Sequence, residues 1–238
     1  VVQSPNFLGL IEPMREHADA AHAVGALLVA VVEPISLAVL EAPGSYRADM
    51  VAAEGQPLGI PLSYGGPYLG LLASHESTIR QLPGRLVGAT RDVRGRRGYV
   101  LTLQAREQHI RREKAASNIC TNQALCALAA TAYLAAVGPD GLREVAELSI
   151  VQARHLATRL EDEGLGRRRL SGTYFNEVAI VVEDADRRHA DLRRRGILAG
   201  YRLGRDYPEL RDTLLLAATE LTTDDDIERL VDALRAAA

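Results

Sequence analysis

The stretch Gly25-Ala-Leu-Leu-Val-Ala-Val-Val-Glu33 is a continuous apolar run that lies between a glycine and Pro34. A run without polar alternation is typical of a strand that is buried on both faces of a parallel sheet. Residues 11–24 carry a weak helical pattern of apolar side chains, and Val1-Val2-Gln3-Ser4-Pro5 has the form of a strand end. Strand, helix and strand together predict a βαβ unit in an α/β protein.

The composition is that of an ordinary soluble globular protein. The 238 residues are 47% hydrophobic and 25% charged, which is enough for one domain or two small ones. No apolar run reaches the ~20 residues of a bilayer crossing and no signal peptide is evident, so we expect a cytoplasmic protein without a membrane partner. Cys120 and Cys126 indicate reduced thiols. Because the chain starts with Val1 at a predicted strand end, we expect a fragment that lacks its N-terminal part.

The remainder of the chain predicts two units. A loop dense in glycine and proline covers residues 55–70, and residues 85–90 and 98–103 form a predicted β-hairpin. An alanine-rich helix at 121–137 ends at Gly138-Pro139. After it we expect helices at 142–160, 185–195 and beyond the capping pair Thr223 and Asp226, with strands at 177–182, 197–203 and 213–219. The predicted domains are therefore residues 1–118 and a helix-led C-terminal domain, residues 119–238.

Common catalytic motifs are missing from the sequence. The six histidines have no cysteine or carboxylate at metal-ligand spacing, so we expect no metal site. There is no Gly-Lys-Ser/Thr loop and no Gly-x-Ser-x-Gly elbow. The stretch Gly65-Gly66-Pro67-Tyr68-Leu69-Gly70 precedes a predicted strand, whereas a dinucleotide fingerprint follows one. Its backbone N–H groups can approach a phosphate, or the stretch is a plain tight connection.

Charge is concentrated in one segment. Between Arg80 and Lys114, ten basic residues stand against three acidic ones, a net of +7 in a chain whose net charge is −3. Such a segment binds an anion or an acidic partner, or it is a solvated helix face. A nucleic-acid partner is disfavoured by the negative net charge and the 4% aromatic content. Lys114 is the only lysine, so a lysine nucleophile within this chain has no other source.

Several motifs together resemble one family. They are Gly55-Gln56-Pro57, Ser63-Tyr64-Gly65-Gly66-Pro67, Arg80-Gln81-Leu82-Pro83-Gly84-Arg85, and the run from Gly98 through Glu113 to Ser117-Asn118-Ile119-Cys120. On these residues the chain resembles the P-protein of the glycine cleavage system, the glycine dehydrogenase (aminomethyl-transferring), EC 1.4.4.2. Within that family it is most similar to the latter half of the first subunit of the two-subunit bacterial form. The resemblance extends over essentially the whole chain.

The resemblance implies a PLP-dependent transferase (aminotransferase) architecture of fold type I, with part of the large domain followed by a small α/β domain. It further implies decarboxylation of glycine and transfer of the aminomethyl group to the lipoyl H-protein. Pyridoxal phosphate (PLP) would be held mainly by the second subunit, whose lysine has its counterpart here near Gln56. We therefore expect no catalytic residue in this chain and no activity of the fragment alone. The alternative is a catalytically silent scaffold for a PLP-dependent partner.

The resemblance also places candidate residues. Gly65, Gly66 and Thr90 are expected at the interface with the second subunit, near the phosphate of its cofactor. Thr90 is equally interpretable as a β-branched strand residue that faces solvent.

The basic segment supplies a second set of candidates. Arg106, Arg111, Arg112 and Asn118 are expected to face the second subunit or the lipoyl partner. At 3.6 residues per turn the three arginines cannot share one face of a continuous helix. At least one of them is therefore expected to be exposed and dispensable, and Arg106 and Arg112 are the expected interface pair if the segment is broken. We expect a break near Ser117-Asn118, where a helix N-cap is plausible.

Overall fold

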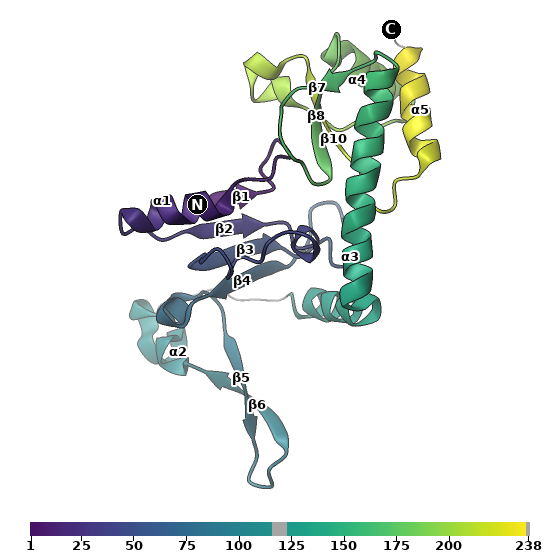
Figure 1. The fold of residues 1–238 in the computed structure, drawn as a ribbon. Coiled ribbons are helices and arrows are strands. Elements are labelled where there is room, and N and C mark those ends of the chain that lie inside the picture. Colours follow the sequence, from purple (N-terminus) through teal and green to yellow (C-terminus); the bar gives the residue numbers. More distant parts are fainter. Residues whose placement is uncertain (116–122, 237–238) are drawn as a thin grey trace.

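The computed structural model describes residues 1–115 and 123–236, which form two α/β units joined by a long helix (Figure 1). The first unit contains a four-stranded sheet in the order β1-β2-β3-β4. Strands β1 to β3 are parallel, and β4 is antiparallel to β3. Helix α1 connects β1 to β2, which confirms the predicted βαβ unit. The bounds are β1 Val2–Ser4, α1 Met14–Ala23, β2 Val29–Val32, β3 Met50–Glu54 and β4 Gly70–Ser74.

Strand β2 is shorter than the apolar run that predicts it. The backbone N–H of Leu28 donates to the Asp49 carboxylate at 2.7 Å instead of joining the ladder, which begins at Val29. The same carboxylate lies 3.0 Å from His22 Nε2, and these hydrogen bonds hold the pKa of Asp49 below its ordinary value. Strand β3 was not predicted, because an Ala-Ala pair has little intrinsic preference for strands.

The predicted hairpin is present and projects away from the sheet (Figure 1). It consists of β5 (Leu86–Arg91) and β6 (Arg97–Thr102). The basic segment after it is broken into three short pieces and is not one continuous helix. These pieces are the 3₁₀ turn η3 (Gln104–Arg106), the helix α2 (Gln108–Arg111) and the 3₁₀ turn η4 (Arg112–Lys114). Before the hairpin lies a 3₁₀ helix, η2 (Glu76–Gln81).

Helix α3 (Ala124–Asp162) joins the two units. Gly138, with φ 63° and ψ −175°, divides it, so the predicted stop is present as a kink. The chain returns to a helix at once, since Pro139 suits a first helical turn. Before the kink, Ala130 packs with Leu58 and Ile60 of the first unit. After it, residues 153–160 enter the core of the second unit. The helix therefore packs in the cores of both units. The predicted domain boundary at residue 118 lies outside the described residues.

Among the described helices, α3 is the one whose length and apolar composition would allow a membrane crossing. The kink at Gly138 interrupts it, and the buried side chains of its second half, such as Leu156 and Leu160, pack within the protein. Before the kink, large apolar side chains such as Leu125 and Leu128 are exposed.

The second unit contains an antiparallel sheet in the order β7-β8-β10-β9, with helices α3, α4 and α5 packed against it. Its core includes the fully buried Leu160, Ile180 and Leu214. Thr223 and Asp226 form the predicted capping box at the start of α5. The bounds are β7 Arg167–Arg168, β8 Glu177–Val181, α4 Ala185–Arg194, β9 Tyr201–Arg202, β10 Thr213–Ala217 and α5 Asp224–Arg235.

Candidate functional site

The parallel strands β1, β2 and β3 end at the same edge of the first sheet, and polar residues follow each of them. Ligands of open α/β sheets bind outside this carboxyl edge. Asn6 follows β1, and its side-chain oxygen accepts hydrogen bonds from the backbone N–H groups of Leu8 (2.9 Å) and Leu10 (3.1 Å). Asn6 therefore shapes the loop at this edge and does not offer its oxygen to a ligand.

Gln56 follows β3, at the position where the resemblance places the cofactor lysine of the partner. Its side-chain amide donates to the carbonyl of Ile60 at 2.5 Å. Glu54 holds both ends of the following loop, because its carboxylate accepts from the N–H groups of Gln56 (3.0 Å) and Leu69 (2.9 Å). The amide is thus committed to the loop and has no nucleophilic amine.

The residues at this edge do not fit a covalently held PLP. The only lysine of the sequence, Lys114, is exposed on η4 and does not belong to the parallel edge. Among residues 1–115 and 123–236, no group of three histidine, cysteine, aspartate or glutamate side chains could hold a metal ion. An imine between the aldehyde of PLP and a lysine would therefore require a lysine from outside this chain.

Two part-buried carboxyl groups, Glu33 and Glu177, lie near the place where the first and second units touch. Burial raises the pKa of Glu33, which follows β2, although hydrogen bonds from the N–H groups of Ile35 and Ser36 oppose this. Nearby Glu177, at the start of β8, raises it further, and burial also raises the pKa of Glu177. The seam between the units therefore contains a carboxyl pair whose charging at neutral pH opposes the folded state.

We expect Glu177→Gln to raise the melting temperature at pH 7. Because the folded-state pKa of Glu177 lies above its ordinary value of 4.5, the folded chain holds more protons there and loses stability as pH rises through that window. The gain of the variant should be present at pH 7 and should vanish below pH 4. Thermal unfolding between pH 3.5 and 8 measures it. Glu147→Gln, on the exposed surface of α3, is the control; an equal gain there would contradict the prediction.

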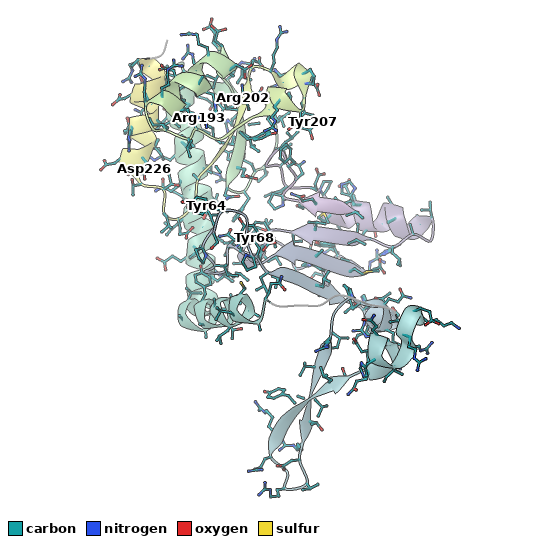
Figure 2. The ribbon with its side chains drawn as sticks, turned by 180° about the vertical axis from the view of Figure 1, so that it is seen from behind. Tyr64, Tyr68, Arg193, Arg202, Tyr207 and Asp226 are labelled. Atoms are coloured by element: carbon teal, nitrogen blue, oxygen red, sulfur yellow. The ribbon has the colours of Figure 1, made fainter. Side chains whose placement is uncertain are left out.

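The glycine loop has an unusual backbone. Ser63, Tyr64, Gly65 and Gly66 all have positive φ, of 47°, 53°, 117° and 114°. For the two that are not glycine this costs roughly 1–2 kcal/mol each. A Cβ atom on Gly65 would meet nothing within 4 Å, and the Tyr64 side chain is fully exposed. Figure 2 shows this tyrosine and Tyr68 beside α3. The loop is a strained, open surface feature of the kind that recurs at functional sites.

Thr90 lies elsewhere. It is on β5, opposite Gly98 and exposed, in the hairpin that projects away from the sheet (Figure 1). The structure of this chain alone does not bring Thr90 together with Gly65 and Gly66. The assignment of these three residues to the cofactor phosphate of a partner stays a prediction.

The three arginines of the basic segment have different environments. Arg106 is buried, with a side chain that is 8% exposed. Its guanidinium donates to the carbonyls of Leu82 and, at 2.5 Å, Gly84, and its Nε lies 3.7 Å from a Glu107 oxygen. These contacts fix the turn that leads into β5. Sequence reasoning assigned Arg106 to an interface, and no residue type in the segment signals the structural role, because every residue has a backbone carbonyl.

Arg111 and Arg112 are exposed. Arg111 donates from Nε to the carbonyl of Ala105 at 3.1 Å, and Arg112 has a left-handed backbone, with φ 53°. Both guanidinium groups therefore remain available to a partner, and their interface role stays a prediction. Asn118 and the helix break expected at Ser117-Asn118 lie outside the described residues. The expected pairing of Arg106 with Arg112 at an interface is weakened, because Arg106 is engaged within the chain.

Comparison with known proteins decides the family. The family model described as the glycine cleavage system P-protein matches residues 1–234. The chain belongs to this family. The "Probable glycine dehydrogenase (decarboxylating) subunit 1" of Thermomicrobium roseum is 54% identical over 238 residues, which are 100% of this chain and 53% of that protein. The protein of the same name from Moorella thermoacetica is 51% identical over 99% of this chain and 53% of its own length. The chain thus spans about half the length of the curated relatives it matches.

Solved structures agree with this membership. A crystal structure of a glycine decarboxylase (P-protein) in inhibitor-bound form superposes with a TM-score of 0.93 at 47% identity, over 100% of this chain and 54% of the other. An alanine–glyoxylate aminotransferase from Nostoc has a TM-score of 0.60 at 15% identity, over 96% of this chain and 58% of its own. The second likeness shows the fold alone. This P-protein family chain therefore has the predicted fold of PLP-dependent transferases of fold type I.

Proposed function

We propose that the chain is part of the glycine decarboxylase subunit that carries no Schiff-base lysine, and that it helps to form a site on a second subunit. The observation that carries this proposal is Gln56, which stands at the lysine position and is bound to the Ile60 carbonyl. Relatives named subunit 1 support it, since that name implies a second subunit. In this proposal the complex is cytoplasmic, decarboxylates glycine and passes the aminomethyl group to the lipoyl H-protein.

The contribution of this chain is to bind and position. PLP on the second subunit would supply the electron sink for decarboxylation. Here Glu54 and Gln56 fix the base of the glycine loop, so that the loop can present Gly65 and Gly66 at a surface that another subunit can approach. The N–H of Gly65 donates to the Leu62 carbonyl at 3.3 Å, which leaves the N–H of Gly66 as the proposed donor to a phosphate. Arg111 and Arg112 offer exposed guanidinium groups to carboxylates of the partner.

A catalytically silent scaffold is the second candidate. It is favoured by the polar residues of the carboxyl edge, since Asn6, Glu54 and Gln56 all make hydrogen bonds within the chain. An assay of glycine–bicarbonate exchange distinguishes the two proposed functions. It uses a complex reconstituted from this subunit, the second subunit and PLP. Gly65→Ala adds a methyl group that meets nothing within 4 Å, and because its φ of 117° strains any L side chain, the variant changes the backbone of the loop rather than filling a contact. Loss of exchange in an intact complex favours a contribution to the site, and unchanged exchange favours the scaffold.

We expect no covalent PLP on this chain. After incubation with PLP and reduction with borohydride, peptide mapping should find no stoichiometric label, because Gln56 cannot form an imine and Lys114 is an exposed surface lysine. The second subunit, treated identically, serves as the positive control. Specific, stoichiometric labelling of Lys114 would contradict the proposal.

A further inference from the structure

The hairpin of β5 and β6 has two different faces. Side chains alternate along a strand, so the cross-strand pairs Val87–Leu101, Ala89–Tyr99 and Arg91–Arg97 share one face. All six residues on this face are exposed. Its large apolar members, Val87, Tyr99 and Leu101, are 63%, 68% and 43% exposed. We call the face that these six residues share the apolar face. Its four apolar residues form a continuous strip, and Arg91 and Arg97 lie at the end of that strip.

The part of the chain that the structure describes leaves the apolar face uncovered. The hairpin projects from the first unit (Figure 1), and the face meets another described element only at its base, where Leu101 lines a small cavity with Gln104 and His109. An isolated two-stranded hairpin is marginally stable in water, because it has too little apolar surface to bury. An exposed apolar strip rimmed by charge is typical of a protein–protein contact. The hairpin therefore has the construction of a docking arm.

Charge at the tip defines what the arm can bind. Arg91 and Arg97 stand directly opposite each other, an arrangement that destabilises a hairpin unless an anion lies nearby. Arg91 donates to the carbonyl of Gly95 at 2.7 Å, while the hairpin's only carboxylate, Asp92, pairs with Arg96 at 2.9 Å. Residues 86–102 thus contain four arginines and one aspartate, a net of +3. This net charge favours an occupant that carries carboxylates.

We infer that the apolar face docks into a groove of the second subunit, one with an apolar floor and carboxylates at the end that receives Arg91 and Arg97. The inference rests on the proposed function, which supplies the second subunit. It goes beyond the expectation for the basic segment, because it assigns the contact to one face of the hairpin. The opposite face, which includes Gly88, Thr90 and Val100, stays outside the groove.

A pair of matched variants tests the inference. Val100 lies between Tyr99 and Leu101 but on the opposite face, and it is 50% exposed. The natural polypeptide that carries this chain is titrated with the second subunit by calorimetry. We expect Tyr99→Glu/Leu101→Glu to weaken association at least about 100-fold, because two buried interface anchors become charged. Val100→Glu should change the affinity less than about 3-fold.

The arginine pair gives a second measurement. Ion pairs between subunits weaken with ionic strength, so association of the wild type should slow as salt is raised. Arg91→Gln/Arg97→Gln should remove most of this dependence. Thermal unfolding of each variant alone should match the wild type, since the apolar face belongs to none of the cores among the described residues. A marked loss of stability in the free polypeptide would show that the rest of that polypeptide covers the face, and the inference would be wrong.

The possible failures are distinguishable. If the wild type binds the second subunit and Tyr99→Glu/Leu101→Glu binds equally well, or Val100→Glu is equally damaging, the hairpin inference is wrong and the proposed function stands. If the wild type does not bind the second subunit at all, the proposed function fails, and the inference fails with it. If the double variant instead dissolves a dimer of this chain in light scattering, with binding to the second subunit intact, the occupant is a second copy and the inference is wrong.

Discussion

Replacing Arg106 with lysine should destabilise the base of the hairpin by about 2–3 kcal/mol. The guanidinium satisfies the carbonyls of Leu82 and Gly84 together and lies close to Glu107 in a buried position. A single ammonium group cannot reproduce this fork, and a part-buried carbonyl that loses its donor costs about 1–3 kcal/mol. Because these contacts belong to the hairpin base, hydrogen exchange of the amides of β5 and β6 is the sensitive measurement.

Arg111→Lys and Arg112→Lys are the matched controls. Both residues are exposed on the same segment, so either replacement should change stability by less than about 0.5 kcal/mol. Their replacement should instead weaken binding to the second subunit, and the affinity can be measured with the same two variant proteins. Equal and near-zero exchange effects for all three replacements would show that the buried fork contributes nothing. A large exchange effect for Arg112→Lys would contradict the distinction between structural and surface arginines.

Arg106 also illustrates what sequence patterns cannot reveal. Its neighbours are charged, so the pattern predicts a surface residue or an interface. The contacts that decide its role are two backbone carbonyls, 24 and 22 residues away in sequence, whose positions depend on the turn before β5. No residue type marks a carbonyl as unpaired, because every residue has one. A buried structural arginine therefore looks like any other member of a charge run.

Local patterns were more informative for the fold. The apolar run before Pro34 predicted a central parallel strand, and Thr223 with Asp226 predicted a capped helix, both of which the structure confirms. These features depend on neighbours within a few residues. Strand β9 was predicted over seven residues and has two, because Gly200 turns with φ 64° against the backbone of Leu215. That close approach is tertiary, so the alternation of apolar residues did not reveal it.

The candidate site likewise has features that the sequence reveals and features that only tertiary packing decides. Gln56 at the lysine position could be recognised from the sequence, because the resemblance fixes the alignment there. The hydrogen bond from its amide to Ile60 required the structure. Likewise, the hairpin could be predicted from its strands and turn, but the exposure of Tyr99 and Leu101 on one face could not. Exposure depends on what packs nearby, and the sequence pattern alone favours neither a covered nor an open hairpin.

Replacing Gly9 with alanine should lower the free energy of unfolding by about 3 kcal/mol or more. Gly9 has φ 87°, in a region where an L side chain is strained by about 1–2 kcal/mol. An added Cβ would also lie 2.7 Å from the carbonyl carbon of Glu177, and closer still to its oxygen. Overlap with backbone cannot be relieved by a rotamer change, so the β1 loop and β8 must separate. Urea denaturation measures the loss, and it is followed by circular dichroism because the chain has no tryptophan for fluorescence.

Gly25→Ala distinguishes the cost of backbone strain from the cost of overlap with Glu177. Gly25 also has a positive φ, 72°, but a Cβ there would meet nothing within 4 Å. Its replacement should therefore cost only the backbone strain, about 1 kcal/mol, and equal losses at the two positions would show that contact with β8 is unimportant. The difference between them reports on the seam itself, where Ile11 donates to the carbonyl of Thr173 at 2.9 Å. The glycine loop and the hairpin both extend from the first unit of this chain. The contact between the first unit and the C-terminal unit therefore holds them at a fixed position relative to the C-terminal unit. Gly9→Ala should then weaken assembly with the second subunit as well, whereas Gly25→Ala should leave it unchanged.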